Sequence, residues 1–371
     1  AIELITERPY PWSRELWALL LDRLCGAGAR LVLFDLVFNN PGDGDHAFHD
    51  ALDRYRGKVV LAANFDAANA MQAIVPNDFL IPPSQMADPR VGYVNFFPDP
   101  LDLRTRAIPY TLTDRMLAGL PPDPSAEVFY SLAARGLAQL GRAQDIPRDN
   151  VAHLLRFTAD EAYPPIPLYE VFDDKFWHQN FHAGAFFKDK IVIVGASAQV
   201  SHDVVDTPLG PDRPGPKLHL EAMAAAMAHQ FLHMTPLWVD YILVVAAGLL
   251  AWGLIGFFRH PQTAFLLLVG VTAVYLAVIR LLYDFTGLFL LSVPVLAVFL
   301  LSGLFSLGYE FMMERLETLR TRRTLERYVS KNLVKEILDN PDSFYSSLKG
   351  VRIPATVLFS DIVGFTSLTE H

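Results

Sequence analysis

Apolar and polar residues change from helical to strand-like spacing and back through the first two thirds of the chain. Leucines recur at helical intervals over residues 12–25, and the apolar, β-branched run over residues 30–38 predicts a buried strand. The same patterns predict strands at 58–63, 91–97 and 190–194, and helices at 125–140 and 218–232. Alternation of this kind is typical of an α/β domain with a largely parallel sheet, and we place that domain at residues 1–236.

Three apolar runs follow, in a block with very few charges. The 73 residues from 237 to 309 include only four charged side chains. A helix needs about 20 residues to cross the ~30 Å hydrocarbon core of a bilayer, and each run is close to that length. We therefore predict three membrane-spanning helices, at about 241–258, 263–283 and 286–309. Arg280, near the end of the middle run, can reach the membrane interface or make a polar contact between helices.

Basic residues predict how these helices are oriented. Seven arginines and lysines follow the last run within residues 310–335, and Arg259 lies between the first two runs. The positive-inside rule then places the C-terminal end in the cytoplasm and residues 1–236 on the other side of the cell membrane. Residues 1–11 contain no apolar signal-peptide core. A domain outside the membrane needs an export signal, so we expect an upstream segment, such as another membrane helix, ahead of them.

Composition excludes several classes of protein. Hydrophobic residues make up 52% of the chain and charged residues 19%, which argues against a disordered chain and, with the apolar block, against a wholly soluble one. The single cysteine, Cys25, cannot form an internal disulfide. The net charge of −9 gives no reason to expect nucleic acid as a partner.

Several polar residues of the α/β domain lie at the ends of predicted strands. Such sheets bind ligands beyond the carboxyl ends of their strands, so these side chains could line a sensor pocket. The alternative is that Asp35 and Asp203 cap helices or turns, a common use of aspartate, and that His219 is a hydrogen-bonded histidine of the core. The candidate pocket residues are Asp35, Asn95, Asp203 and His219.

Short motifs follow one another along this domain: Phe34-Asp35 with Pro41-Gly42-Asp43, the run 92–96 with Asp99 and Arg104, Gly195-Ala196-Ser197, Asp206-Thr207-Pro208, and Pro214-Gly215 with His219. In this order they resemble the CHASE2 family, the extracytoplasmic sensor domains of bacterial transmembrane signalling proteins, which implies a bacterial inner membrane. The resemblance covers nearly all of residues 12–236, and the three apolar runs fit the membrane helices that typically follow in that family. Leu220, after His219, lies where alanine is usual.

A charged segment with an apolar stripe follows the third run. Leu316, Leu319, Leu325 and later apolar residues recur at helical intervals, which predicts a cytoplasmic transducer helix within residues 310–345. The Asn340-Pro341 step is expected to end it. Such a helix is suited to pairing with a second copy of itself or to packing on its own downstream domain.

The last residues of the chain carry a pattern suited to binding a metal–triphosphate. An apolar, β-prone run at 356–360 predicts a buried strand, Asp361 follows it, and Gly364 and Thr366 open the next helix. A carboxylate provides a hard oxygen ligand for Mg²⁺, and the N–H groups of a helix N-terminus bind phosphate. The alternative is an aspartate that caps a turn or a helix.

The strings RYVS at 327–330, NPD at 340–342 and FSDIVGFT at 359–366 closely resemble the start of class III adenylate/guanylate cyclase domains. This resemblance implies a ferredoxin-like α/β domain that begins near residue 346 and works as a homodimer. It implies conversion of ATP, or GTP, to the cyclic nucleotide and pyrophosphate, with two Mg²⁺ or Mn²⁺ ions. Asp361 would bind both ions and Ile362 would add its backbone carbonyl. The residues that would contact the phosphates are Val363, Gly364, Phe365 and Thr366.

Of the catalytic domain itself, the resemblance covers only about 26 residues, 346–371. The second metal carboxylate, the base-selecting residues and the residues that stabilise the transition state lie further downstream in that family, so we expect this chain alone to be inactive. The partners we expect are a second copy, ATP or GTP, membrane lipid and an unidentified extracytoplasmic signal.

Three other functions fit less well. A sensor histidine kinase would need a histidine just after the last span, and His371 is the only histidine after residue 309. A diguanylate cyclase usually has a second aspartate where Val363 stands here. A transporter would need more ionisable groups in the membrane block than Arg280 and Asp284. The alternative to the adenylate cyclase is a CHASE2 membrane sensor with a different or degenerate output, such as a guanylate cyclase, a diguanylate cyclase or a histidine kinase.

Overall fold

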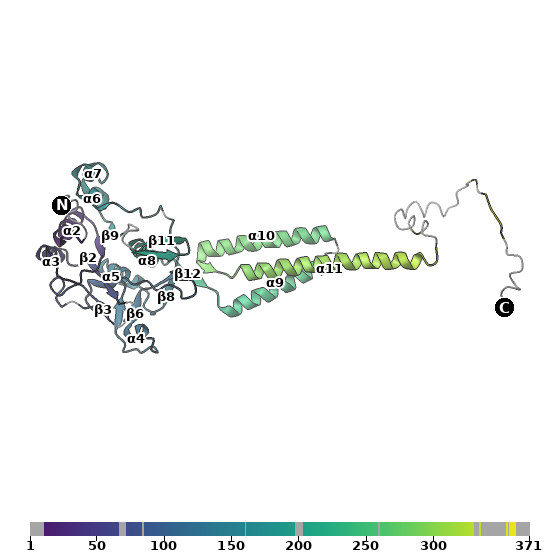
Figure 1. Ribbon diagram of the computed structural model, residues 1–371, viewed down its shortest axis with the longest axis horizontal. Coiled ribbons are helices and arrows are strands. Elements are labelled where there is room, and N and C mark those ends of the chain that lie inside the picture. The colour runs from purple at the N-terminus through teal and green to yellow at the C-terminus, as the bar shows by residue number, and fades with distance from the viewer. Residues whose placement is uncertain are drawn as a thin grey trace. The chain divides into compact units, whose positions relative to one another are not determined.

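The computed structural model describes residues 11–66, 72–83, 85–159, 161–196, 203–258, 260–329, 334, 354 and 356–360. The chain divides into two units. The first, the sensor unit, comprises residues 1–235 together with 278–290, and the second comprises 236–277 together with 291–371. Each is described by itself, with the element labels of Figure 1.

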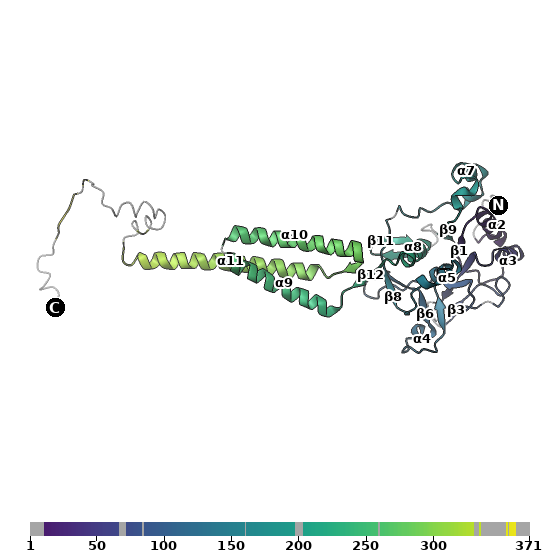
Figure 2. The ribbon, with the colours of Figure 1, turned by 180° about the vertical axis from the view of Figure 1, so that it is seen from behind.

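A five-stranded sheet forms the centre of the sensor unit. Strand β1 (Leu31–Asp35) pairs in parallel with β2 (Val59–Phe65) on one side and with β9 (Ile191–Gly195) on the other. β2 also pairs in parallel with β4 (Val91–Tyr93) and antiparallel with β3 (Ala73–Ile74). The predicted α/β domain with a largely parallel sheet is therefore confirmed, and Figure 2 shows β9 beside β1.

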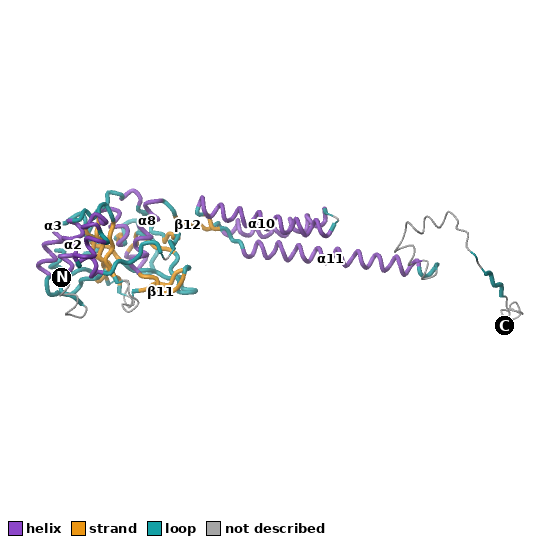
Figure 3. Tube along the Cα trace, turned by 90° about the horizontal axis from the view of Figure 1, so that it is seen from above, coloured by secondary structure: helices purple, strands orange, loops and turns teal. Residues whose placement is uncertain are grey.

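Helices cover both faces of this sheet, because successive strand residues point to opposite sides. Val32 and Phe34 of β1 pack into one apolar cluster with helices α2 (Arg14–Gly26) and α3 (Asp45–Arg54). Leu31 and Leu33 pack into a second cluster with α5 (Leu132–Gln139) and α8 (Gly215–Ala228). Figure 3 shows the strands in orange among these helices. β1 and β4 are buried along their whole length and β2 at all but one position, as their continuous apolar runs predict, whereas the edge strands β3 and β9 are half-buried.

A second, four-stranded sheet lies in the same unit. Its order is β13 (Leu288–Phe289), β12 (Phe231–Met234), β8 (Ala152–Leu155) and β5 (Ala107–Pro109). β12 pairs antiparallel with β8 and in parallel with β13. The remaining elements are the paired strands β6 (Thr111–Thr113) and β7 (Val128–Tyr130), the pair β10 (Val204–Thr207) and β11 (Gly210–Pro214), the helices α4 (Asp114–Leu117), α6 (Leu168–Phe172) and α7 (Asp174–Gln179), and 3₁₀ turns at Ala143–Asp145 and His182–Phe187.

Three helices are long and apolar enough to cross a membrane: α9 (Leu237–Phe257), α10 (Pro261–Thr286) and α11 (Val293–Leu325). Alanines let them approach closely, since Ala247 and Ala251 of α9 and Ala264 of α10 are buried in one cluster with Phe299 of α11. Many of their outward-facing apolar side chains are exposed, as expected for a surface that meets lipid. The three predicted apolar helices are confirmed, and they are consistent with a membrane protein.

Two helices predicted in the sensor unit have different bounds. Residues 125–140 contain the strand β7 before α5, because Ser131 caps α5 by accepting a hydrogen bond from the backbone N–H of Ala134, 3.1 Å away. The helix predicted at 218–232 is α8, which ends where His229 turns left-handed, with φ +52°. The residues after that turn form β12. The strand predicted at 91–97 ends earlier, at Tyr93.

The third membrane helix also differs from its predicted bounds. Gly287, with φ +68°, follows the end of α10, and Pro294 lies in the first turn of α11, so residues 287–292 are not helical and include β13 instead. In the other direction α11 runs past residue 309 without a break, which joins the predicted span and the predicted transducer helix. It ends at Leu325, and residues 330–333 and 335–345 lie outside the described part of the chain.

The buried strand predicted at 356–360 is not formed. These residues have no strand assignment, and the Phe359 side chain is 92% exposed. A strand needs a neighbour to bind its N–H and C=O groups, and none of the described strands pairs with this segment.

Substitution of Gly92 tests the packing of β4 against α5. A Cβ atom at this position would lie 2.7 Å from the Cα of Leu132 and 2.9 Å from the carbonyl carbon of Ser131, which are backbone atoms that cannot move aside. We expect Gly92→Ala to destabilise the protein by about 1–3 kcal/mol, measured as a lower midpoint of thermal unfolding. Gly26→Ala is the control, because nothing lies within 4 Å of its Cβ position. Equal midpoints for the two variants would contradict this packing.

Candidate functional site

Three of the four candidate pocket residues lie together at the carboxyl edge of the central sheet. The parallel register of β1 and β9 places Asp35 beside Gly195, where both strands end. Nε2 of His219, from α8, lies 3.7 Å from Oδ2 of Asp35. Asp203, just before β10, is close enough for its charge to raise the pKa of Asp35. Asp35, Asp203 and His219 form the polar cluster of the sensor unit.

Two glycines allow the elements of the polar cluster to approach. A Cβ atom on Gly195 would lie 2.5 Å from Cγ of Pro216 and 3.0 Å from Cβ of Asp35. A Cβ atom on Gly215 would lie 2.7 Å from Oδ1 of Asp203. The first residues of α8 therefore fit against the ends of β1 and β9 only with glycine at both positions. The Asp203 carboxylate then lies next to the N-terminus of α8, where the helix dipole favours negative charge.

His219 is buried without a hydrogen bond. Its ring stacks on Phe96, with centroids 4.7 Å apart, and the residue is 2% exposed. Among the described residues neither ring nitrogen has a hydrogen-bond partner, so the interpretation of His219 as a hydrogen-bonded histidine of the core is wrong. Burial lowers the pKa of His219 to about 3, because the charged imidazolium cannot be solvated there.

Burial also shifts the pKa values of the two aspartates of the polar cluster. Burial, and then the charge of Asp203, raise the pKa of Asp35 well above its usual value, and burial raises the pKa of Asp203. Neither caps a helix: α2 and α3 are capped by Ser13 and Gly44, and α8 has no side-chain cap. A neutral carboxyl donates a hydrogen bond and an unprotonated imidazole accepts one, so Asp35 and His219 can hold or exchange a proton.

Asn95 does not belong to the polar cluster. Its Oδ1 accepts a hydrogen bond from the backbone N–H of Phe65, 2.8 Å away, and its Nδ2 donates to the carbonyl oxygen of the same residue, 3.0 Å away. The amide side chain thus continues the pairing of β2 beyond the end of β4. Asn95 has a structural role in the sheet.

The sequence of this chain matches a known family of sensor domains. A model of the CHASE2 domain family matches residues 2–258, which is more than two thirds of the chain. The chain belongs to the CHASE2 family. No curated protein and no solved structure matches it. The match extends through α9, so the first membrane helix is part of the region that the family model covers.

The CHASE2 domain buries two charged networks that the sequence did not reveal. In the first, a carboxylate oxygen of Glu221 accepts hydrogen bonds from Thr158 and from Arg213, whose nitrogen is 3.2 Å away. This contact joins α8 to β11 and to the loop after β8. A glutamate within the otherwise apolar run of α8 was the available signal, because a charge in that position needs a buried partner.

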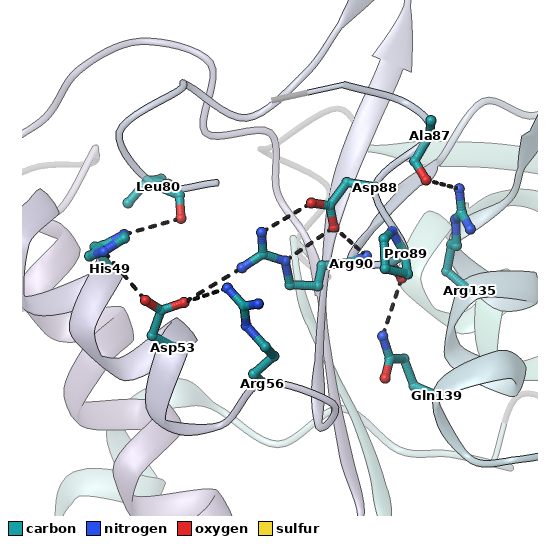
Figure 4. Close-up of polar contacts among 10 residues, drawn as sticks. All are labelled: His49, Asp53, Arg56, Leu80, Ala87, Asp88, Pro89, Arg90, Arg135 and Gln139. Carbon is teal, nitrogen blue, oxygen red and sulfur yellow. Dashed lines mark hydrogen bonds and ion pairs between the residues drawn. The ribbon is translucent and has the colours of Figure 1, made fainter. Parts of the chain in front are cut away.

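Figure 4 shows the second network, around Arg90. Arg90 is only 6% exposed. Its guanidinium makes two hydrogen bonds to Asp88, at 3.1 and 3.0 Å, and lies 3.7 Å from Asp53 of α3. Arg135 of α5 donates to carbonyl oxygens of the same loop, including that of Ala87. The network joins the Pro-rich loop before β4 to helices on both faces of the sheet, which is a structural role.

A third contact involves the end of α10 that belongs to the sensor unit. Arg156, which follows β8, donates to the backbone oxygen of Tyr283, 2.9 Å away, and to Oδ1 of Asp284, 3.3 Å away. Its guanidinium lies 4.7 Å from the centre of the Tyr283 ring, within cation–π range. Asp284 also pairs with Arg280 at 2.9 Å, so the polar contact expected for Arg280 is made within its own helix.

The predicted metal and phosphate residues cannot be placed. Asp361, Ile362 and the run 363–366 lie outside the described part of the chain. Within the described ranges, no group of three or more histidine, cysteine, aspartate or glutamate side chains could hold a metal ion.

The polar cluster predicts a specific pH dependence. His219 binds a proton less readily in the folded protein, with a pKa of about 3, than in the unfolded chain, where it is near 6.5. Folding stability therefore falls as the pH falls from about 6.5 towards 3. The raised pKa of Asp35 has the opposite sign, since stability is lost as the pH rises through its folded value.

We expect His219→Phe, which keeps an aromatic ring against Phe96, to flatten the acid side of the plot of unfolding midpoint against pH. Asp35→Asn should instead remove the loss of stability that the wild-type protein shows as the pH rises above about 3.8, the usual aspartate value. Parallel curves for the wild-type protein and His219→Phe would contradict the burial of an unprotonated imidazole.

Proposed function

We propose that this CHASE2 protein is a receptor-type class III nucleotide cyclase that converts ATP, or GTP, to the cyclic nucleotide and pyrophosphate. The CHASE2 domain and the three apolar helices support a membrane receptor with a signalling role. The cyclase output rests on one observation, the string FSDIVGFT at 359–366, which is highly specific for the start of that catalytic domain.

The residues of this string have the chemistry that a triphosphate site needs. The Asp361 carboxylate and the Ile362 carbonyl are hard oxygen donors, which suit Mg²⁺ or Mn²⁺. A turn at 363–366 would supply backbone N–H groups for the β- and γ-phosphates. The metal ions, when bound, neutralise charge that develops on the phosphates.

A homodimer is part of this proposal. Met312, Leu316 and Leu319 of α11 are exposed at intervals of four and three residues, which is the spacing of a coiled-coil seam. Pairing along this stripe would bring together two catalytic domains. The basic residues of 310–335 favour a cytoplasmic position for them, with the CHASE2 domain outside the cell membrane.

The four-stranded sheet offers a route for the signal. β8 and β5 belong to the CHASE2 domain, β12 leads directly into α9, and β13 lies in the chain between α10 and α11. A ligand that binds one arrangement of the domain better than another would shift this sheet and the helices that it adjoins in the chain. The packing of the two α11 helices would then set the activity.

The test is an assay of membranes that contain the full-length receptor, with ATP or GTP and Mn²⁺. We expect the wild-type protein to form cyclic AMP or cyclic GMP, and Asp361→Ala to reduce the rate to background because the metal ligand is lost. Asp339→Ala, in the transducer segment, is the control and should retain activity. No product from folded wild-type receptor, or full activity of Asp361→Ala, would contradict the cyclase and leave a membrane sensor with a different output.

A further inference from the structure

The strand at the edge of the central sheet has the composition of a central strand. β9 reads IVIVG, with no lysine, proline or bulge inside it to protect its free edge. Strands with continuous apolar runs are normally paired on both sides within parallel sheets. Among the described strands, β9 pairs only with β1.

The free edge of β9 presents backbone hydrogen-bonding groups. The carbonyl oxygen of Lys190 accepts a hydrogen bond from the N–H of Arg30, and so points towards β1. Because successive residues of a strand direct their peptide groups to opposite sides, those of Ile191 and Ile193 point away from β1. A chain lying alongside β9 would find both donors and acceptors there.

A large apolar groove runs along this edge. It has a volume of about 1830 Å³ and is lined by β9 itself together with residues from both helical layers. Leu20 and Leu24 of α2 lie on the side to which Val192 and Val194 pack. Met223 and Met227 of α8 lie on the side to which Ile191 and Ile193 pack. Pro-rich residues 163–168 complete the lining.

The size and chemistry of the groove favour an extended peptide. Pockets for small molecules usually measure about 300–1,000 Å³, so this groove is larger than such a ligand needs. A hydrocarbon chain would leave the peptide groups of Ile191 and Ile193 unpaired, which is costly in an apolar setting. A β-strand binds those groups and points alternate side chains at the two apolar walls.

Charge favours a partner other than a second copy. Among the described lining residues, Lys190, Arg213 and Lys217 are basic and Asp212 is acidic, and Glu221, which pairs with Arg213, adds a second negative charge. A second copy of the domain would bring the same excess of positive charge. An apolar segment with acidic residues at its ends complements the groove better.

We propose that this groove binds an extended apolar peptide of another protein, with acidic flanks, which adds to the central sheet beside β9. This inference rests on the proposed receptor function, for which it names the chemical class of the signal. Its test reads binding directly and needs no cyclic nucleotide, so it stands or falls separately from the cyclase.

The probe is a fluorescent, end-blocked peptide of sequence EEVIVIVEE, added to the full-length receptor in lipid nanodiscs. We expect saturable binding to the wild-type protein and slower hydrogen exchange at the amide of Ile193 once the peptide is bound. The same peptide with alternate amides N-methylated should bind about tenfold more weakly or worse, because its strand hydrogen bonds are lost.

Two variants of α8 form a matched pair. Ala224 lines the groove, so Ala224→Trp should weaken binding by tenfold or more. Ala228 is exposed at the end of the same helix and does not line the groove, so Ala228→Trp should bind like wild type.

Four results would overturn the proposal. The first is no saturable binding of the probe, and the second is equal binding by Ala224→Trp and Ala228→Trp. The third is full protection of the Ile191 and Ile193 amides before peptide is added, which would show that the receptor's own polypeptide fills the groove. The fourth is protection that rises with receptor concentration alone, which would identify a second copy as the occupant.

Discussion

The structure depends on the pairing of one short strand, β12, with a neighbour on each side. β8 on one side belongs to the CHASE2 domain, and β13 on the other adjoins the membrane helices in the chain. The backbone N–H of His233 donates to the carbonyl oxygen of Gly287, 2.9 Å away. A Cβ atom at Gly287 would lie 2.5 Å from the carbonyl oxygen of Phe231, so only glycine allows this approach. The sheet therefore joins, by hydrogen bonds, segments that adjoin α9, α10 and α11.

The polar cluster shows that burial in this domain is not governed by stability alone. Two carboxyl groups and an imidazole that lacks hydrogen bonds lie at the carboxyl edge of the sheet, where an apolar set of side chains would be less costly. By contrast, the charged networks around Arg90 and Glu221 are bound to protein partners that join neighbouring elements. Buried ionisable groups with shifted pKa values are typical of functional sites.

The sequence predicted the parts of the fold that depend on local pattern. Continuous apolar runs such as that of β1 indicated buried parallel strands. Three of the four candidate pocket residues, Asp35, Asp203 and His219, lie together in the structure. The sequence did not predict β12 or β13, since strands of four and two residues carry no periodic signal. The contact of Arg156 with Asp284 joins residues 128 positions apart, and Asn95 left the cluster because its amide fits the backbone of a neighbouring strand. Neither depends on local pattern.

The ladder of β12 and β13 joins the CHASE2 domain to the segments of the chain that adjoin the membrane helices. Hydrogen exchange at the His233 amide of the full-length receptor tests it most directly. We expect this amide to be protected, and Arg156→Gln, which removes the guanidinium that binds Tyr283 and Asp284, to increase its exchange. Arg148→Gln, on an exposed loop, should leave it unchanged. A His233 amide that exchanges as fast as an unstructured peptide, or that does not respond to Arg156→Gln, would contradict the claim.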